Sequence, residues 1–130
     1  MIIGIGTDIL NLKTIRLSVQ DPEDPFVRKT YTEKERSLIA SRPLPVYSYA
    51  TRFAGKEAVF KSLNTNGDAL RLNEIEILEN ENGQPTVHLH GRAAALAKEK
   101  GISHIFISLS YDTDYATAFA VAVSRQDSVG

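Results

Sequence analysis

The sequence has no cysteine. This absence excludes thiol catalysis, Cys-X-X-Cys redox chemistry and thiolate zinc sites. It says little about the compartment, because missing disulfides favour a reducing cytosol only mildly. No basic leader precedes the first apolar run, and no stretch approaches the ~20 apolar residues of a membrane span. We therefore expect a soluble, cytoplasmic protein that does not enter a membrane.

An excess of charge of either sign is also missing. The chain has 15 Lys and Arg against 16 Asp and Glu, a formal net charge of -1. No global basic field is present to hold nucleic acid or an anionic membrane, so any anionic partner must meet a local patch. The apolar share of 42% is ordinary for a globular protein. The length suits a single domain over residues 1–130 with its own core.

Helical and strand patterns occur in mixed order along the chain. Strands are expected at 2–9, 74–78, 86–89, 105–110 and 115–123, and helices at 9–19, 32–41, 46–63 and 91–100. The turn-rich segment 81–85 predicts a hairpin, the two prolines of 21–25 predict a loop, and the polar tail 124–130 is expected to fray. Glu35 follows Thr32 by three residues, which is the spacing of a capping box at the start of the helix 32–41. Because strict strand–helix alternation is absent, we expect an α+β fold with an antiparallel sheet packed on a long central helix.

Asp8 follows Gly6 and Thr7 at the end of the first expected strand. A carboxylate beside glycine can reach a ligand without bulky neighbours. The same position also suits the N-cap of the next helix. Position alone therefore leaves both interpretations of Asp8 open.

The expected helix 46–63 carries Glu57 and Lys61, which are four residues apart and therefore neighbours on one face. Apolar residues, including Val59 and Leu63, also occupy the opposite side. No clean polar face remains, so we expect a mostly covered helix. Charged groups on a covered helix are costly unless they are paired or bound to an ion. Glu57 and Lys61 form either an ordinary ion pair or part of an ion site.

Asp8, Glu57 and Lys61 would suit phosphoryl chemistry if the fold brings them together. Mg²⁺ takes oxygen ligands, often one or two carboxylates together with substrate phosphates and water. A nearby lysine can neutralise charge on transferring phosphate oxygens. The positions are far apart in sequence, so spacing alone does not show that they meet.

Two polar pairs on expected strands have weaker interpretations. Ser108 and Ser110 share one side of a strand. They either help to bind a phosphate or are exposed serines at the edge of a sheet. His88 and His90 also lie two apart. They could share a metal, but no third ligand stands near them in sequence, so solvent-facing side chains are favoured.

Taken in order, these segments resemble the holo-acyl-carrier-protein synthase family of phosphopantetheinyl transferases. The family opens with a strand ending in G-x-G-x-D, similar to residues 4–8. Its main signature, R-F-A-x-K-E-A-x-x-K, matches residues 52–61 throughout. The segment F-T-x-x-E is similar to residues 31–35. Weaker matches are G-x-P at 83–85 and S-x-S-H at 108–111.

The resemblance implies catalytic roles for three residues. Asp8 and Glu57 would hold Mg²⁺, which also binds the pyrophosphate of coenzyme A. Lys61 would contact the same phosphates and stabilise charge as the bond breaks. The implied reaction transfers 4'-phosphopantetheine from coenzyme A to a serine of an acyl carrier protein. A serine hydroxyl needs a base, and either Glu57 itself or a metal-bound water would take its proton.

The resemblance also implies binding surfaces. The nucleotide end of coenzyme A would lie against Arg52, Lys56, Lys61, Pro85 and Ser110. An acidic carrier would dock on basic residues after the first strand, for which the candidates are Lys13, Arg16 and Arg28. These three are otherwise ordinary surface charges.

Short members of the family form homotrimers with active sites between subunits. By analogy, the Ser110 strand or the Pro85 turn of one subunit would serve the Asp8 and Glu57 of its neighbour.

Two departures from the family pattern stand out. Tyr111 occupies the usual histidine position and supplies a neutral donor in place of a possible cation. The acidic segment 21–25 lies near the expected docking residues, where it would repel acidic carriers or select an unusual one. These departures suggest an alternative, a non-catalytic relative that binds coenzyme A or a carrier. Intact Asp8, Glu57 and Lys61 favour the enzyme. No motif indicates whether such an enzyme serves fatty-acid synthesis or a secondary pathway.

Overall fold

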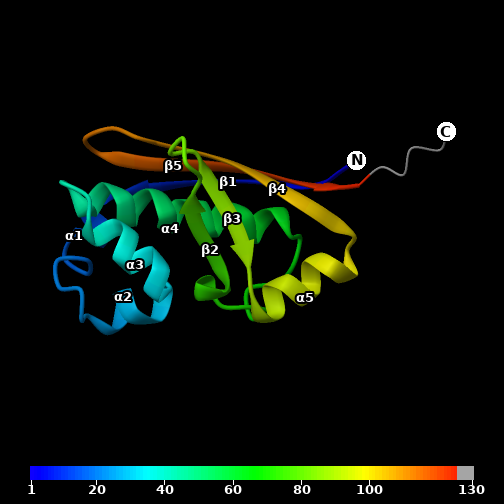
Figure 1. The fold of residues 1–130 in the computed structure, drawn as a ribbon, viewed down its shortest axis with the longest axis horizontal. Coiled ribbons are helices and arrows are strands. Elements are labelled where there is room, and N and C mark those ends of the chain that lie inside the picture. The colour runs from blue at the N-terminus through cyan, green and yellow to red at the C-terminus, as the bar shows by residue number, and fades with distance from the viewer. Residues whose placement is uncertain (126–130) are drawn as a thin grey trace.

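The structure is a computed structural model that describes residues 1–125 (Figure 1). The predicted fraying of 124–130 falls mostly on 126–130, which lie outside the described residues. The strands are β1 (Ile2–Asn11), β2 (Ile75–Glu79), β3 (Pro85–Leu89), β4 (Ile102–Tyr111) and β5 (Tyr115–Ser124). The helices are α1 (Leu12–Arg16), α2 (Pro25–Thr30), α3 (Glu33–Ala40), α4 (Pro45–Ser62) and α5 (Gly91–Glu99), with a short 3-10 helix, η1, at Leu72–Glu74.

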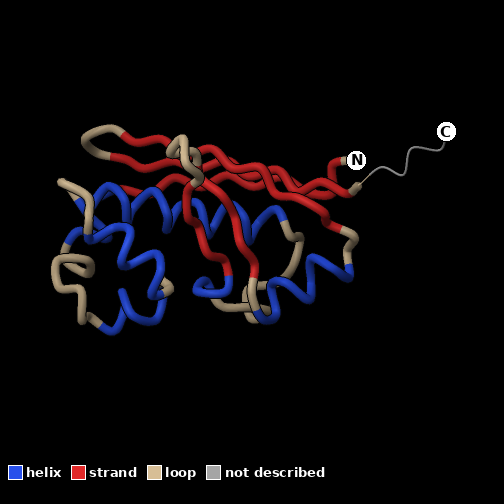
Figure 2. Tube along the Cα trace, in the orientation of Figure 1, coloured by secondary structure: helices blue, strands red, loops and turns tan. Residues whose placement is uncertain are grey.

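Two antiparallel sheets surround the long helix α4. The larger sheet has the strand order β1-β5-β4, and β2 and β3 form a separate hairpin. Figures 1 and 2 show the three long strands along one side of α4, with the hairpin and the short helices on the other sides. The predicted α+β fold on a central helix is confirmed. No helix within residues 1–125 is long and apolar enough to cross a membrane.

The glycines of β1 allow the strand to press directly on α4. A Cβ atom on Gly6 would lie 1.9 Å from the carbonyl oxygen of Ala58, and one on Gly4 would lie 2.0 Å from that of Ser62. Any side chain at these positions would force the two elements apart. The paired glycines therefore set the distance between β1 and α4, and with it the place where Asp8 meets the helix.

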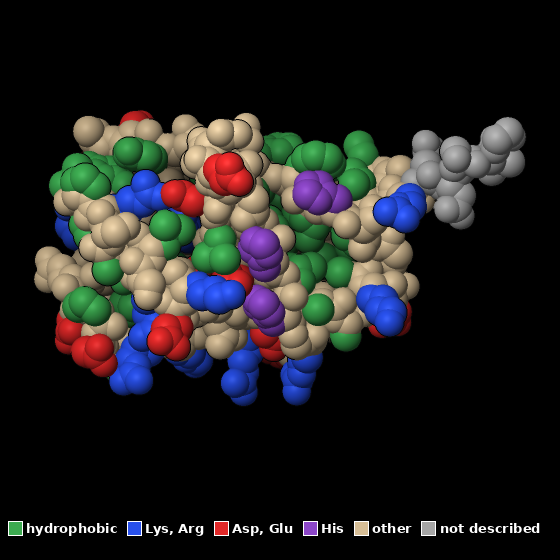
Figure 3. Space-filling model, viewed as in Figure 1, with side chains coloured by type: hydrophobic (Ala, Val, Ile, Leu, Met, Phe, Trp, Pro, Cys, Tyr) green, Lys and Arg blue, Asp and Glu red, His purple; other side chains and the backbone are tan. Residues whose placement is uncertain are grey.

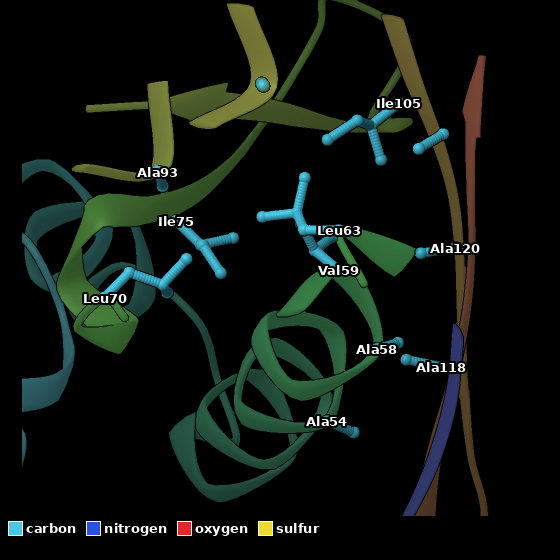
Figure 4. Close-up of a cluster of buried hydrophobic side chains, with 12 residues drawn as sticks. Ala54, Ala58, Val59, Leu63, Leu70, Ile75, Ala93, Ile105, Ala118 and Ala120 are labelled. Carbon is cyan, nitrogen blue, oxygen red and sulfur yellow. The ribbon is translucent and has the colours of Figure 1, made fainter. Parts of the chain in front are cut away.

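Small side chains also line the contact between α4 and β5, whereas Ile107 and Leu109 of β4 reach α4 at Gly55. Figure 4 shows Ala54 and Ala58 of α4 on the side of the helix that faces the strand of Ala118 and Ala120, while Val59 and Leu63 lie on its other side. Each of these alanines is buried. Because alanine fills little space, the strands and the helix approach closely and leave only the helix flanks free to carry polar groups.

The first helical region differs from its prediction. We expected one helix over 9–19, but β1 continues to Asn11 and α1 covers only Leu12–Arg16. The Asn11 side chain caps α1 by accepting from the Lys13 backbone N–H at 3.0 Å. Helix α2 was not predicted. Its first residue is Pro25, which suits the first helical position, and the carboxylate of Asp24 caps it.

The predicted capping box at the start of α3 is confirmed, with Thr32 and Glu35 bonding each other's backbone N–H groups. Thr32 also donates from its hydroxyl to the buried carboxylate of Glu76, which contacts His90 at 3.0 Å on its other oxygen. Burial alone would raise the pKa of Glu76, but the hydrogen bonds from Thr32 and His90 outweigh it and hold this pKa below its usual value. Glu76 thus links α3 to the hairpin as an ionised group.

A Glu76→Gln variant should show a flatter dependence of stability on pH. A carboxyl whose pKa is lowered by folding stabilises the native state above its unfolded pKa, and this contribution disappears as pH falls through the folded pKa. Urea denaturation between about pH 6 and about pH 3 should therefore show a smaller loss of unfolding free energy in the variant than in the wild type. Glu81→Gln, on the exposed hairpin turn, is the control and should keep the wild-type slope. Equal slopes for Glu76→Gln and wild type would contradict the prediction.

Candidate functional site

The corner between β1 and α4 is formed by the predicted catalytic residues Asp8 of β1 and Lys61 of α4, which are in direct contact. The ammonium of Lys61 lies 3.3 Å from Asp8 Oδ1 and donates to the backbone carbonyl of Thr7 at 2.8 Å. The Asp8 carboxylate is mostly buried, whereas the lysine side chain is half exposed at 51%. Asp8 was predicted at a strand end, but it lies within β1, which continues to Asn11, and Asn11 rather than Asp8 caps α1. Asp8 faces the helix that carries Lys61, and the pair lies open to solvent on one side.

Glu57 belongs to the same corner, one turn before Lys61 on α4. Burial raises the pKa of Glu57, the negative charge of Asp8 raises it further, and Lys61 partly opposes both effects. The effect of Asp8 on the pKa of Glu57 indicates that the two carboxylates lie near each other at this corner. Their proximity costs free energy in the absence of a cation.

Asp8 and Glu57 fit a magnesium site by the chemistry of their donors. Carboxylate oxygens are hard ligands, and Mg²⁺ commonly uses one or two of them while phosphates and water complete its octahedron. Within residues 1–125, no group of three or more His, Cys, Asp or Glu side chains is arranged to hold a metal ion. A cation held by Asp8 and Glu57 would take its remaining ligands from water or from substrate phosphates.

A separate cavity of about 410 Å³, here called the Arg52 pocket, lies on the other flank of α4. It is bounded by α4, the β2–β3 hairpin and the end of β4, and its lining includes Arg42, Tyr47, Arg52, Pro85 and Tyr111. Cavities of about 300–1,000 Å³ are typical of small-molecule sites. Of the five residues predicted to bind coenzyme A, Arg52 and Pro85 line this pocket.

The guanidinium of Arg52 bonds mainly to residues of the β2–β3 hairpin. Its Nε donates to the carbonyl of Ile77 at 3.1 Å, and Nη2 lies 3.5 Å from the carboxylate of Glu79. Burial lowers the pKa of Arg52, while Glu79 raises it. Arg42 pairs with the same carboxylate. Glu79 therefore holds two arginines at the pocket wall with one negative charge between them, which leaves net positive charge for an anionic ligand.

An aromatic pair forms another part of the pocket wall. The rings of Tyr47 and Tyr111 stack with centroids 4.8 Å apart and an interplanar angle of 29°. Tyr111 was noticed in the sequence only as a departure from a family pattern. Tyr47 and Arg42 were not anticipated, because neither belongs to a motif and nothing local marks them as pocket residues.

Lys56 does not lie where the sequence interpretation placed it. Its side chain is fully buried, and its ammonium donates to Glu35 at 2.7 Å and to the carbonyls of Leu72 and Ile75. No surface of Lys56 remains for coenzyme A. We therefore correct its assignment from ligand binding to the packing of α4 against α3 and β2.

Ser110 lies on the sheet face that points away from α4. Its partner in the register is Thr117 of β5, and both neighbours along the strand, Leu109 and Tyr111, line the Arg52 pocket. Successive strand residues alternate between faces, so Ser110 is turned away from that pocket. Within one chain it meets neither Glu57 nor Arg52.

The three basic residues expected to dock a carrier are all exposed. Lys13 and Arg16 lie on α1, immediately after the strand that carries Asp8. Arg28 lies on α2 and pairs with Glu23 at 3.2 Å. The acidic segment 21–25 therefore neutralises Arg28 within the chain, while Lys13 and Arg16 have no ion pair among the described residues.

The histidines are surface groups in the structure. Figure 3 shows the histidine side chains on one face of the molecule. His88 forms a hydrogen bond with Thr86, and His90 contacts Glu76, so the two residues have different partners. This arrangement agrees with the solvent-facing interpretation of the pair.

The sequence is similar to that of a known protein family. Residues 4–120 match the family model described as the 4'-phosphopantetheinyl transferase superfamily. The holo-acyl-carrier-protein synthase of Desulforudis audaxviator is 38% identical over 98% of this chain and 98% of its own length.

Solved structures with the same fold include ligand complexes. The Plasmodium yoelii acyl carrier protein synthase with ADP bound has a TM-score of 0.85 and 33% identity, covering 97% of this chain and 98% of that one. The Chronobacterium ammoniagenes ACPS–CoA complex has a TM-score of 0.80 and 25% identity, covering 95% of this chain and 98% of that one.

Proposed function

The chain belongs to the holo-acyl-carrier-protein synthase family of phosphopantetheinyl transferases, and from this membership we propose that it modifies a carrier serine with the help of Mg²⁺. Its enzymatic activity is transfer of 4'-phosphopantetheine from coenzyme A to an acyl carrier protein. The observation that carries the magnesium proposal is the meeting of Asp8, Glu57 and Lys61 at one corner. A single domain spanning 1–130 is part of the same proposal.

Each residue of the corner has a role in the proposed transfer. The carrier serine oxygen forms a bond to the β-phosphorus of coenzyme A, the bond to the bridging pyrophosphate oxygen breaks, and adenosine 3',5'-bisphosphate leaves. Mg²⁺ held by Asp8 and Glu57 would supply Lewis acidity and neutralise pyrophosphate charge. Lys61 stabilises the charge that develops on the leaving phosphate. The serine proton goes to a base at this corner, for which Glu57 and a water bound there are the two candidates.

The Arg52 pocket is our proposed site for the nucleotide end of coenzyme A. Arg42 and Arg52 provide positive charge, and the Tyr47–Tyr111 pair provides a flat apolar surface. Tyr111 thus supplies stacking area where the family pattern has a histidine. This replacement leaves phosphate recognition to the arginines.

The two halves of the proposed site lie at opposite edges of one sheet. The carboxylates are beside β1 and the pocket is beside β4, with β5 between them. The face of this sheet away from α4 is apolar, since Ile5, Ile9, Phe106 and Phe119 are each 49–65% exposed. Large exposed apolar patches mark interfaces. These features support a homotrimer in which the β4 edge of one chain, including Ser110, meets the β1 corner of the next.

Phe119→Asp should convert the proposed trimer into monomers. Phe119 lies on the central strand β5, so a carboxylate there would be desolvated at the centre of the interface. Light scattering after size exclusion should give a trimer mass for wild type and a monomer mass for the variant, and carrier modification should be lost with assembly. Lys98→Asp on the exposed side of α5 is the control and should remain trimeric. A monomeric, fully active wild type would contradict the proposal.

The carrier is proposed to dock on α1. Lys13 and Arg16 lie next to the Asp8 strand, and their charges complement an acidic partner. Arg28 contributes less, because Glu23 already pairs with it. A cytoplasmic location stays a prediction, and no motif of the sequence names the carrier or the pathway.

Mass spectrometry of an apo acyl carrier protein tests the whole proposal. Incubation with this enzyme, coenzyme A and Mg²⁺ should add the mass of one phosphopantetheine, and replacement of Mg²⁺ by a chelator should abolish the gain. A carrier whose acceptor serine is changed to alanine is the matched control. Carrier binding without a gain in mass would indicate a binding module. Modification that is insensitive to chelation would remove the metal from the proposal.

A further inference from the structure

The carboxylate of Glu79 lies in the wall of the Arg52 pocket, the proposed site for the nucleotide end of coenzyme A. Glu79 is the last residue of β2, where it pairs with Pro85 of β3. Of the residues within 1–125 that line this pocket, Arg42, Arg52 and Glu79 carry a full charge. A carboxylate repels an anionic ligand, so its presence in such a site needs a separate explanation.

Glu79 contacts both arginines of the pocket at once. One carboxylate oxygen pairs with Arg42, and the other lies 3.5 Å from Nη2 of Arg52. Burial lowers the pKa of Arg52, Glu79 raises it, and the charge of Arg42 lowers it again. The two guanidiniums are therefore close enough to repel each other, and Glu79 offsets part of this repulsion.

Arg52 depends on Glu79 for its counter-charge. The Arg52 side chain is only 7% exposed, and its Nε donates to the carbonyl of Ile77 at 3.1 Å. A buried charge without a partner is strongly destabilising. The charge of Glu35 also acts on Arg52, but Glu35 forms its own ion pair with Lys56. In the empty pocket, Glu79 is therefore the carboxylate that neutralises Arg52.

Arg42 is the more accessible of the two arginines. It lies in the connection between α3 and α4, and its side chain is 36% exposed. The Glu79 side chain is 24% exposed, so a ligand in the pocket can reach the contact between Glu79 and Arg42. Phosphate and carboxylate oxygens accept the same pair of hydrogen bonds from a guanidinium. A ligand phosphate and Glu79 would thus compete for Arg42.

We propose that Glu79 is a built-in competitor of the nucleotide in the Arg52 pocket. In the free protein its carboxylate neutralises both arginines, and a phosphate of the incoming nucleotide takes its place on Arg42. This inference rests on the proposed nucleotide site. The apparent affinity falls in proportion to the fraction of molecules in which Arg42 is free of Glu79. Glu79 thereby limits how tightly the nucleotide product is held and favours its release.

Glu79→Gln should bind adenosine 3',5'-bisphosphate about tenfold more tightly than wild type, or better, in calorimetric titration. The free variant should melt at a lower temperature because Arg52 loses its counter-charge, and the nucleotide should raise this midpoint more than it does in wild type. Glu81→Gln removes the same charge from the exposed hairpin turn and should bind as wild type does. A merely structural Glu79 would give weaker binding in its variant, and equal or weaker binding would overturn the proposal.

Nuclear magnetic resonance of the wild-type chain tests the displacement without a substitution. Saturation with adenosine 3',5'-bisphosphate should shift the carboxyl carbon of Glu79 and the Nε–H of Arg42 together, because the contact between them is broken. A shifted Arg42 signal with an unchanged Glu79 carboxyl signal would show that the nucleotide binds without displacing Glu79, and the proposal would be wrong.

Arg42→Met distinguishes failure of the Glu79 role from failure of the nucleotide site. This variant should bind adenosine 3',5'-bisphosphate about tenfold more weakly than wild type, since it loses a charged phosphate partner. Weaker binding here without a gain in Glu79→Gln would keep the site and refute the role of Glu79. Unchanged binding by Arg42→Met would place the nucleotide elsewhere and refute both. Arg92→Met, on the exposed side of α5, is the control and should bind as wild type does.

Discussion

Glu57→Gln is expected to slow carrier modification by about two to three orders of magnitude, the size of effect seen when one stabilising group of a charged transition state is removed. Glu57 and Asp8 are the two carboxylates proposed to hold the metal at the corner between β1 and α4, so glutamine removes half of the proposed charged ligand set. The loss should appear in the rate of mass gain by the apo carrier at saturating coenzyme A.

The same substitution should leave the fold intact or slightly more stable. Glu57 is half buried and next to Asp8, and both conditions disfavour its charge. A neutral amide removes the free-energy cost of holding a charge at this position. Replacing a functional residue often stabilises a protein in this way. The effect of Mg²⁺ on thermal unfolding gives a second measurement, because a ligand that binds the native state raises the midpoint temperature of unfolding. Added Mg²⁺ should stabilise wild type and not the variant.

Glu99→Gln controls for the loss of one negative charge. Glu99 lies exposed near the end of α5 and should keep both the rate and the Mg²⁺ response. Wild-type turnover by Glu57→Gln would remove Glu57 from the mechanism and with it the two-carboxylate site.

Lys56→Met should destabilise the native state by about 3–5 kcal/mol, the usual cost of removing one partner of a buried ion pair. Both side chains of the Lys56–Glu35 pair are fully buried, and their charged atoms are 2.7 Å apart. Glu35 also accepts from the backbone N–H of Thr32 and Ile77. Methionine keeps most of the volume but leaves the carboxylate without a counter-charge.

A double-variant cycle separates the pair from general packing. Glu35→Gln combined with Lys56→Met removes both charges, so the unfolding free energy of the double variant should fall by less than the sum of the two single losses. Denaturant unfolding measures all four proteins. Lys98→Met, an exposed lysine of α5, should change stability by no more than about 0.5 kcal/mol. A Lys56→Met protein within about 1 kcal/mol of wild type would contradict the central place of this ion pair.

The sequence by itself determined the features that depend on neighbouring residues. The period of 46–63 predicted α4, the spacing of Thr32 and Glu35 predicted the capping box, and the turn at 81–85 predicted the hairpin. These signals are local, because hydrogen bonds between residues a few positions apart carry them. The resemblance of whole segments then indicated the family.

Only the tertiary structure decided which face of each element meets which partner. Lys56 and Lys61 share one helix, yet Lys56 is buried against Glu35 and Lys61 reaches Asp8 in solvent. The helical period separates their faces but does not say what covers either one. Likewise, the stacking of Tyr47 on Tyr111 follows from how α4 packs on the sheet. Burial and pairing arise from contacts between distant segments, and these exist only once the chain has folded.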